Sequence, residues 1–105
     1  MKRRNPPHRW LLNIQPEAKQ IFDTLSRTNK QGAFRRLKEL LNADDPYVLP
    51  FVEMLQAKKF GRLRKFRVGD YRVFFTVESK EVTHLQHTYK GTLFLLAIRD
   101  RKEAY

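Results

Sequence analysis

Apolar and polar residues alternate most clearly in the stretch RLRKFRVGDYRVFFTVE, which surrounds the dipeptide Gly69-Asp70. Alternation with a period of two is typical of β-strands, because successive side chains point to opposite faces of a sheet. Glycine and aspartate both tolerate the positive φ angles of a tight hairpin turn. The pattern therefore predicts a β-hairpin whose first strand places Lys65 and Arg67 on the face opposite Phe66. The second strand is predicted to have one apolar face, made of Val73, Phe75 and Val77.

Two stretches with helical spacing precede this hairpin. Pro16 occupies a position that suits the first turn of a helix, and apolar residues then recur at helical spacing as far as about Arg27. Residues 29–32 interrupt the pattern. A second helix is predicted from the apolar stripe that follows, which consists of Ala33, Phe34, Leu37, Leu40 and Leu41. Two amphipathic helices this close in sequence form an antiparallel hairpin that must cover an apolar surface, and the sheet is the obvious candidate.

Strands are also predicted at both ends of the chain. Residues 8–14 form a first strand, and the nearly continuous apolar run at 92–99 is typical of a central one. Residues 47–59 form either a short helix that starts at Pro50 or a covering loop. Residues 82–89 alternate only weakly and lie between two turn signals. The predicted fold class is α+β, with an N-terminal strand and an antiparallel helical hairpin packed on one face of an antiparallel β-sheet.

Length and composition narrow the class of protein. With 105 residues the chain suits one domain over residues 1–105, in which the basic segment 1–7 ends in Pro-Pro and is expected to be a flexible arm. Lysine and arginine number 22 against 11 acidic residues, and this formal charge of +11 favours a polyanionic partner such as nucleic acid. The absence of cysteine excludes thiolate catalysis and cysteine-ligated zinc. The longest apolar run, 93–98, is too short to span a bilayer, so a cytoplasmic protein without membrane contact is expected.

Four cations fall on consecutive predicted strands: Lys65, Arg67, Arg72 and Arg99. If these strands are neighbours, the side chains converge on one sheet surface. Guanidinium groups bind phosphate bidentately, and several of them neutralise the charge of a phosphoryl transition state. Lys65 or Tyr105 would then accept a ribose 2′-OH proton, which amounts to metal-free RNA cleavage by internal attack of the 2′-oxygen. The alternative is a solvated strand face that merely keeps the sheet soluble.

Other chemistries receive little support from the sequence. His84 and His87 have no third ligand nearby, so no metal site is predicted. No glycine-rich phosphate loop or Ser-His-Asp order is present, and no cofactor is expected.

Two blocks of the chain resemble a known family. RKFRVGDYRVFFTV resembles the signature of the RelE/ParE toxin superfamily, in which a basic strand, a G-D-Y-R turn and an apolar strand recur. AIRDRKEAY resembles the last strand of that family, with an arginine followed six residues later by a C-terminal tyrosine. The helical hairpin before these blocks fits the family's order of elements, so the resemblance implies a RelE-like fold.

The resemblance is to the RelE-type branch, whose members are mRNA interferases that enter the ribosomal A site and cut mRNA there. It implies catalytic roles for Lys65, Arg67, Arg72, Arg99 and Tyr105. Further cations are expected to bind RNA, namely Lys58, Lys59, Arg62, Arg64 and Arg101. One position departs from the pattern, because a second catalytic lysine of the family would fall at Leu63. The segment 79–91 is also longer than the resemblance leads us to expect between these strands, so an extra strand or loop is expected there.

The function implied by this resemblance is that of a toxin from a toxin–antitoxin system, acting as a ribosome-dependent endoribonuclease without metal or small-molecule cofactor. The expected partners are a cognate antitoxin, mRNA, and the ribosome with its 16S rRNA. Two alternatives stay open. The ParE branch shares the fold, inhibits DNA gyrase and lacks this catalytic set. A non-catalytic relic that binds RNA or an antitoxin is suggested by Leu63.

Overall fold

The computed structural model describes residues 8–55 and 62–102. The predicted arm 1–7, the cations Lys58 and Lys59, and Tyr105 lie outside these residues. The elements, in chain order, are β1 (Trp10–Ile14), α1 (Pro16–Thr24), α2 (Arg27–Asn42), the 3-10 helix η1 (Pro46–Val48), β2 (Glu53–Met54), β3 (Arg64–Val68), β4 (Tyr71–Glu78), β5 (Val82–His84), β6 (His87–Tyr89) and β7 (Gly91–Asp100).

The main sheet has five strands in the order β1-β7-β4-β3-β2. β7 pairs with β1 on one side and with β4 on the other, which confirms that the apolar run at 92–99 is a central strand. The β3–β4 hairpin is antiparallel and turns at Gly69 and Asp70, as predicted, with Gly69 at a φ of +58°. β1 is parallel to β7, so the sheet is antiparallel from β2 to β7 and mixed at its β1 edge. The predicted α+β fold class is confirmed.

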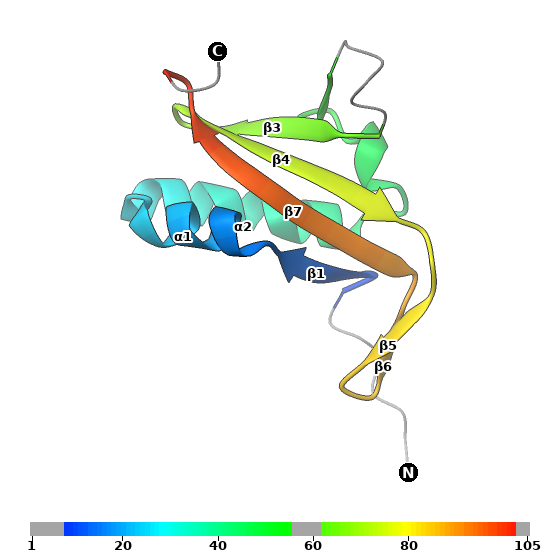
Figure 1. Cartoon of the computed structure of the whole chain (residues 1–105). Coiled ribbons are helices and arrows are strands. Elements are labelled where there is room, and N and C mark those ends of the chain that lie inside the picture. Colours follow the sequence, from blue (N-terminus) through cyan, green and yellow to red (C-terminus); the bar gives the residue numbers. More distant parts are fainter. Residues whose placement is uncertain (1–7, 56–61, 103–105) are drawn as a thin grey trace.

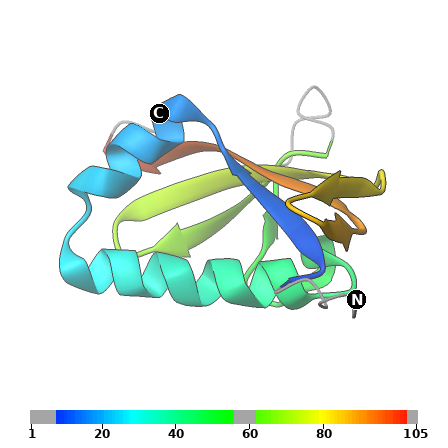
Figure 2. The ribbon, with the colours of Figure 1, turned by 90° about the horizontal axis from the view of Figure 1, so that it is seen from below.

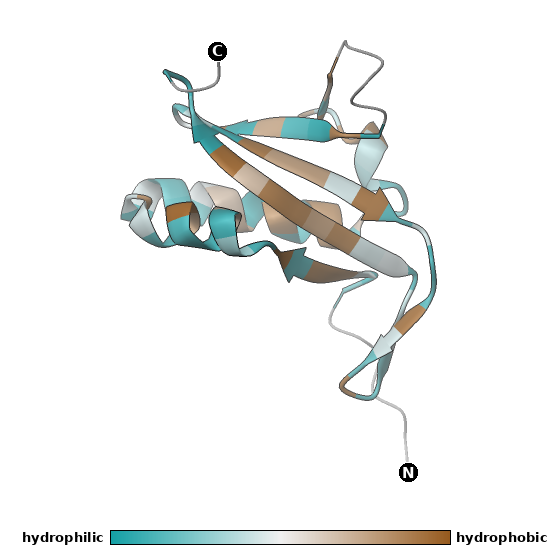
Figure 3. Cartoon of the chain, viewed as in Figure 1, coloured by the Kyte–Doolittle hydropathy of each residue, from teal (hydrophilic) through white to brown (hydrophobic). Residues whose placement is uncertain are grey.

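The side chains that face the helices form the core. Phe66 and Phe75 are fully buried and pack on each other with their ring centroids 6.0 Å apart. The alternation predicted for the hairpin is confirmed, because Val73, Phe75 and Val77 are all buried. Figure 3 shows the hydrophobic residues concentrated along β4 and β7, and Figure 2 shows α2 running beside the sheet. In the described part of the chain neither α1 nor α2 covers the opposite face of β3 and β4.

The boundary between the helices differs from the prediction. The interruption expected at residues 29–32 is helical, and the break lies at Leu25 and Ser26 instead. Ser26 ends the break because its hydroxyl accepts a hydrogen bond from the backbone N–H of Asn29, which caps α2. Gly32 stays inside the helix where α2 approaches the sheet closely, since a Cβ at this position would lie 3.3 Å from Val68 Cγ1.

This cap leads to a stability prediction. Replacing Ser26 with alanine removes the acceptor and is expected to lower the free energy of unfolding by about 1 kcal/mol. Ser26→Asp keeps an acceptor at the same place and should unfold close to the wild type. Urea denaturation of the three proteins measures the difference, and equal midpoints for wild type and Ser26→Ala would show that α2 does not depend on this cap.

The segment before β3 is not a helix that begins at Pro50. Residues 46–48 form η1, a turn follows, and Glu53 and Met54 pair with β3 as the short edge strand β2. Phe51 packs edge-on against Phe66 with the ring centroids 5.7 Å apart, so this part of the chain does cover the core as the loop alternative required. Glu53 and Met54 pair with the free edge of β3 instead of forming a helix, because the pairing provides hydrogen-bond partners for backbone groups of both strands.

Between β4 and β7 the chain forms the extra strands that the length of segment 79–91 allowed. β5 and β6 make a two-stranded hairpin that extends away from the main sheet. Its turn consists of Leu85 and Gln86, both at positive φ. His84 and His87 are directly paired across this hairpin, and no group of three or more metal-ligating side chains gathers in the described ranges. None of the helices described is long and apolar enough to cross a membrane.

Candidate functional site

Three arginines from three strands lie side by side on the face that the helices leave uncovered. Arg67 of β3 is paired in register with Arg72 of β4, and Arg72 is paired with Arg99 of β7. Directly paired residues project to the same face, so the three side chains form one row across the sheet, which we call the arginine row. Like charges placed directly opposite each other are destabilising, so the row favours a bound anion beside it.

Lys65 lies on the same face, one pair further along β3. Its partners in register are Phe74 on β4 and Glu53 on β2. It is half-buried, whereas Arg67 is exposed. The structure therefore brings three of the predicted catalytic residues into one row and the fourth, Lys65, next to it, while Tyr105 lies outside the described residues.

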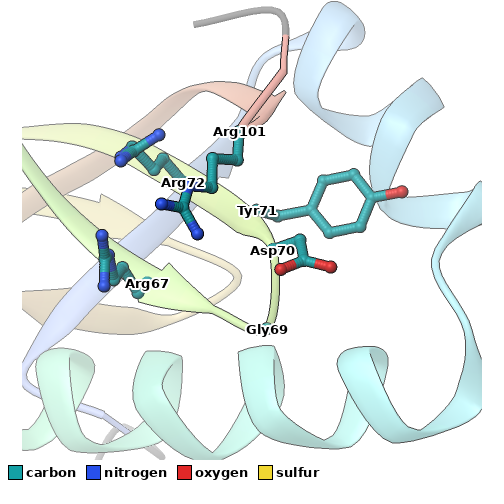
Figure 4. Close-up of a pocket in the computed structure, with 6 residues that line it drawn as sticks. All are labelled: Arg67, Gly69, Asp70, Tyr71, Arg72 and Arg101. Atoms are coloured by element: carbon teal, nitrogen blue, oxygen red, sulfur yellow. The ribbon is translucent and has the colours of Figure 1, made fainter.

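A small pocket of about 40 Å³ opens at one end of this row, beside the β3–β4 turn. We call it the arginine pocket, and its lining residues are Arg67, Gly69, Asp70, Tyr71, Arg72 and Arg101. Figure 4 shows the guanidinium groups of Arg67, Arg72 and Arg101 gathered on one side of the hairpin, while Tyr71 points away from them. The backbone N–H of Arg101 donates to the carbonyl oxygen of Asp70 at 2.7 Å, which ties the end of β7 to the turn.

Arg101 is predicted to bind RNA, and in the structure it lies beside Arg67 and Arg72, two of the predicted catalytic arginines. Strand alternation does not account for this position, because β7 ends at Asp100 and Arg101 lies in the turn that follows. The backbone hydrogen bond to Asp70 holds Arg101 beside the β3–β4 turn instead.

Burial differs along the row. Arg72 is only 8% exposed, and it lies between the two exposed arginines Arg67 and Arg99. Arg99 comes within 3.9 Å of Glu17 on α1, but the Glu17 side chain is 77% exposed, so this ion pair holds Arg99 weakly. A charge that is shielded from water acts more strongly on an anion than an exposed one does. Arg72 also lines the arginine pocket, so its shielded charge lies beside any anion that enters there.

The remaining predicted RNA-binding cations in the described ranges do not join this site. Arg64 projects to the helix side of the sheet, where its guanidinium stacks 4.7 Å from the centre of the Tyr47 ring. Arg62 is exposed and lines a different hollow, shared with Tyr47 and Lys90. Leu63 is half-buried just before β3 and supplies no charge. Arg64 thus lies on the opposite face of β3 from Lys65, as the alternation predicts, and its role in RNA binding stays a prediction.

The chemistry available to this face follows from its residue types. Arginine remains protonated in proteins, so the row binds an anion and stabilises added negative charge but does not accept a proton. Proton transfer requires another group, and Lys65 is the lysine that lies next to the row. The arrangement suits a phosphodiester that is held by guanidinium groups and attacked from within.

Comparisons with known proteins support the fold only. No family model matches the chain, and no curated protein matches it. Among solved structures it is similar to the crystal structure of an archaeal RelE–RelB complex from Pyrococcus horikoshii OT3. The match has a TM-score of 0.66 and covers 91% of this chain and 99% of the other, with 20% sequence identity. The chain therefore has a RelE-like fold.

Proposed function

We propose that this chain is the toxin of a toxin–antitoxin pair and that it cleaves mRNA in the ribosomal A site. The observation that carries the proposal is the arginine row, with its adjoining pocket, on the uncovered face of a RelE-like sheet. A solvated face has no need to align three like charges across three strands.

In the proposed reaction the ribose 2′-oxygen attacks the adjacent phosphorus and displaces the 5′-oxygen of the next nucleotide. A 2′,3′-cyclic phosphate and a free 5′-hydroxyl are formed. Arg72 and Arg99 stabilise the charge on the non-bridging oxygens, and Arg67 with Lys65 positions the backbone. Lys65 or Tyr105 accepts the 2′-OH proton, and the 5′-oxygen takes up a proton from water as it leaves.

The ribosome is proposed to position the substrate, and the basic surface of the chain to hold 16S rRNA. Binding should then weaken steeply as salt rises, because phosphate contacts release counterions. The solved neighbour is a RelE–RelB complex, and by analogy an antitoxin with an acidic toxin-binding segment is proposed to neutralise this chain by covering the arginine row.

Primer extension on an mRNA in a purified translation system tests the proposal. The expected result is cuts inside codons that appear only when ribosomes are present. Intact mRNA combined with inhibition of DNA gyrase in a supercoiling assay would favour the ParE-like alternative, and neither effect would favour a non-catalytic binding protein.

The pocket adds a prediction for Arg101. Replacing it with alanine removes one of three guanidinium groups and is expected to lower the single-turnover cleavage rate about tenfold, the value of one charge-assisted hydrogen bond. The neighbouring Lys102→Ala variant removes the same charge outside the pocket and should cleave like the wild type. Equal rates for both variants would remove Arg101 from the site.

A further inference from the structure

A second hollow lies on the other side of the β3–β4 turn, between that turn and α2. It has a volume of about 370 Å³, within the range of sites that bind small molecules, roughly 300–1,000 Å³. Val68 and Gly32 lie where strand and helix come closest. We call this hollow the helix groove.

Its lining is cationic and polar. Arg35, Arg36 and Arg67 contribute charge, and Thr28, Asn29 and Gln31 contribute hydrogen-bonding side chains. None of the lining residues within the described ranges has a carboxylate. Two other wide hollows among the described residues differ in this respect, since one includes Asp44 and Asp45 and the other includes Glu39. An anionic ligand is thus attracted more strongly to the helix groove than to either of these hollows.

One arginine in the wall of the groove is oriented by its neighbours. The guanidinium of Arg36 lies 4.4 Å from the centre of the Phe51 ring and 3.6 Å from a carboxylate oxygen of Glu39. The turn lies close to α2, since a Cβ on Gly69 would come within 3.2 Å of the Asn29 side-chain carbon Cγ. A side chain that is already oriented loses less entropy when a ligand binds than one that must first become ordered.

The helix groove meets the arginine pocket at the turn, because Arg67 and Gly69 line both. A ligand with regularly repeated anions can therefore occupy the two hollows at once. A single-stranded RNA has this property, and its ribose hydroxyls match the amide and hydroxyl side chains between the arginines. We propose that the helix groove binds the sugar-phosphate backbone of the same RNA strand whose reactive phosphate lies on the arginine row. This inference rests on the proposed function.

The test uses a short fluorescent single-stranded RNA without ribosomes, on which the proposed cleavage depends, with affinity measured by anisotropy at several salt concentrations. Arg35→Ala is expected to weaken binding about five- to tenfold and to reduce the slope of log affinity against log salt by about 0.7, the contribution of one phosphate contact. Lys38→Ala removes the same charge from the same helix outside the groove and should bind almost like the wild type. Arg35→Lys, which keeps the charge, should recover most of the salt slope.

Equal losses for Arg35→Ala and Lys38→Ala would overturn the inference, since charge alone would then explain binding. The inference would also be overturned if Arg35→Ala left RNA binding unchanged but weakened the binding of a poly-glutamate peptide. The groove would then fit an acidic protein segment. The measurement does not depend on catalysis. A wild-type protein that binds RNA through Arg35 without cutting mRNA on ribosomes would contradict the proposed function and leave the groove assignment standing.

Discussion

Replacing Arg72 with alanine is expected to lower the single-turnover rate of ribosome-dependent mRNA cleavage by about 100- to 1,000-fold, the usual effect of removing one preorganised donor to a charged transition state. Arg72 is the central and most buried member of the arginine row, and its neighbours Arg67 and Arg99 are paired with it on either side. Quantitative primer extension with toxin in excess over ribosomes measures the rate. This substitution should have the largest effect on activity of any single arginine in the row.

Two controls separate chemistry from folding. Arg72→Lys keeps the charge but loses the planar fork that binds phosphate bidentately, so its rate should lie between those of wild type and Arg72→Ala. Arg27→Ala removes an exposed charge from α2, on the helix side, and should cleave normally. If Arg72→Ala remained folded by circular dichroism and cleaved mRNA at the wild-type rate, the catalytic assignment of the arginine row would be wrong.

Replacing Gly91 with alanine is expected to lower the free energy of unfolding by about 3 kcal/mol or more, at the upper end of the cost of overpacking. A Cβ at this position would overlap the carbonyl oxygen of Glu78 and approach Trp10 Cζ3 to 2.8 Å. Gly91 is the first residue of β7 and is paired with Trp10 of β1, so neither neighbour can move without disturbing the sheet. Guanidinium denaturation measures the loss.

Gly32→Ala serves as the matched control. A Cβ there would lie 3.3 Å from Val68 Cγ1, a close contact with the end of a side chain. Alanine favours the helix by about 1 kcal/mol over glycine, which offsets that contact, so this variant should unfold near the wild type. A Gly91→Ala protein as stable as Gly32→Ala would show that the start of β7 has more freedom than its packing indicates.

The local pattern of the sequence was sufficient for most elements. The alternation around Gly69 and Asp70 identified the hairpin and the face of each of its side chains, because strand periodicity depends only on consecutive residues. It did not locate the break between the helices. The irregular apolar spacing of residues 29–32 suggested a break there, but the hydroxyl of Ser26 caps α2, so the helix begins before these residues. Nor did it find β2, whose two residues adopt strand geometry only because β3 offers them a free edge.

The sequence identified the candidate catalytic residues but not their arrangement in space. Arg67, Arg72 and Arg99 are distributed over more than thirty positions of the chain, and only the order β7-β4-β3 and its register place them in one row. The same order brings Arg101 to the pocket and sets Arg64 on the opposite side. Strand order and register depend on pairing between distant segments, which no local periodicity encodes. The sequence thus determined which cations are available, and the tertiary structure decided which of them meet.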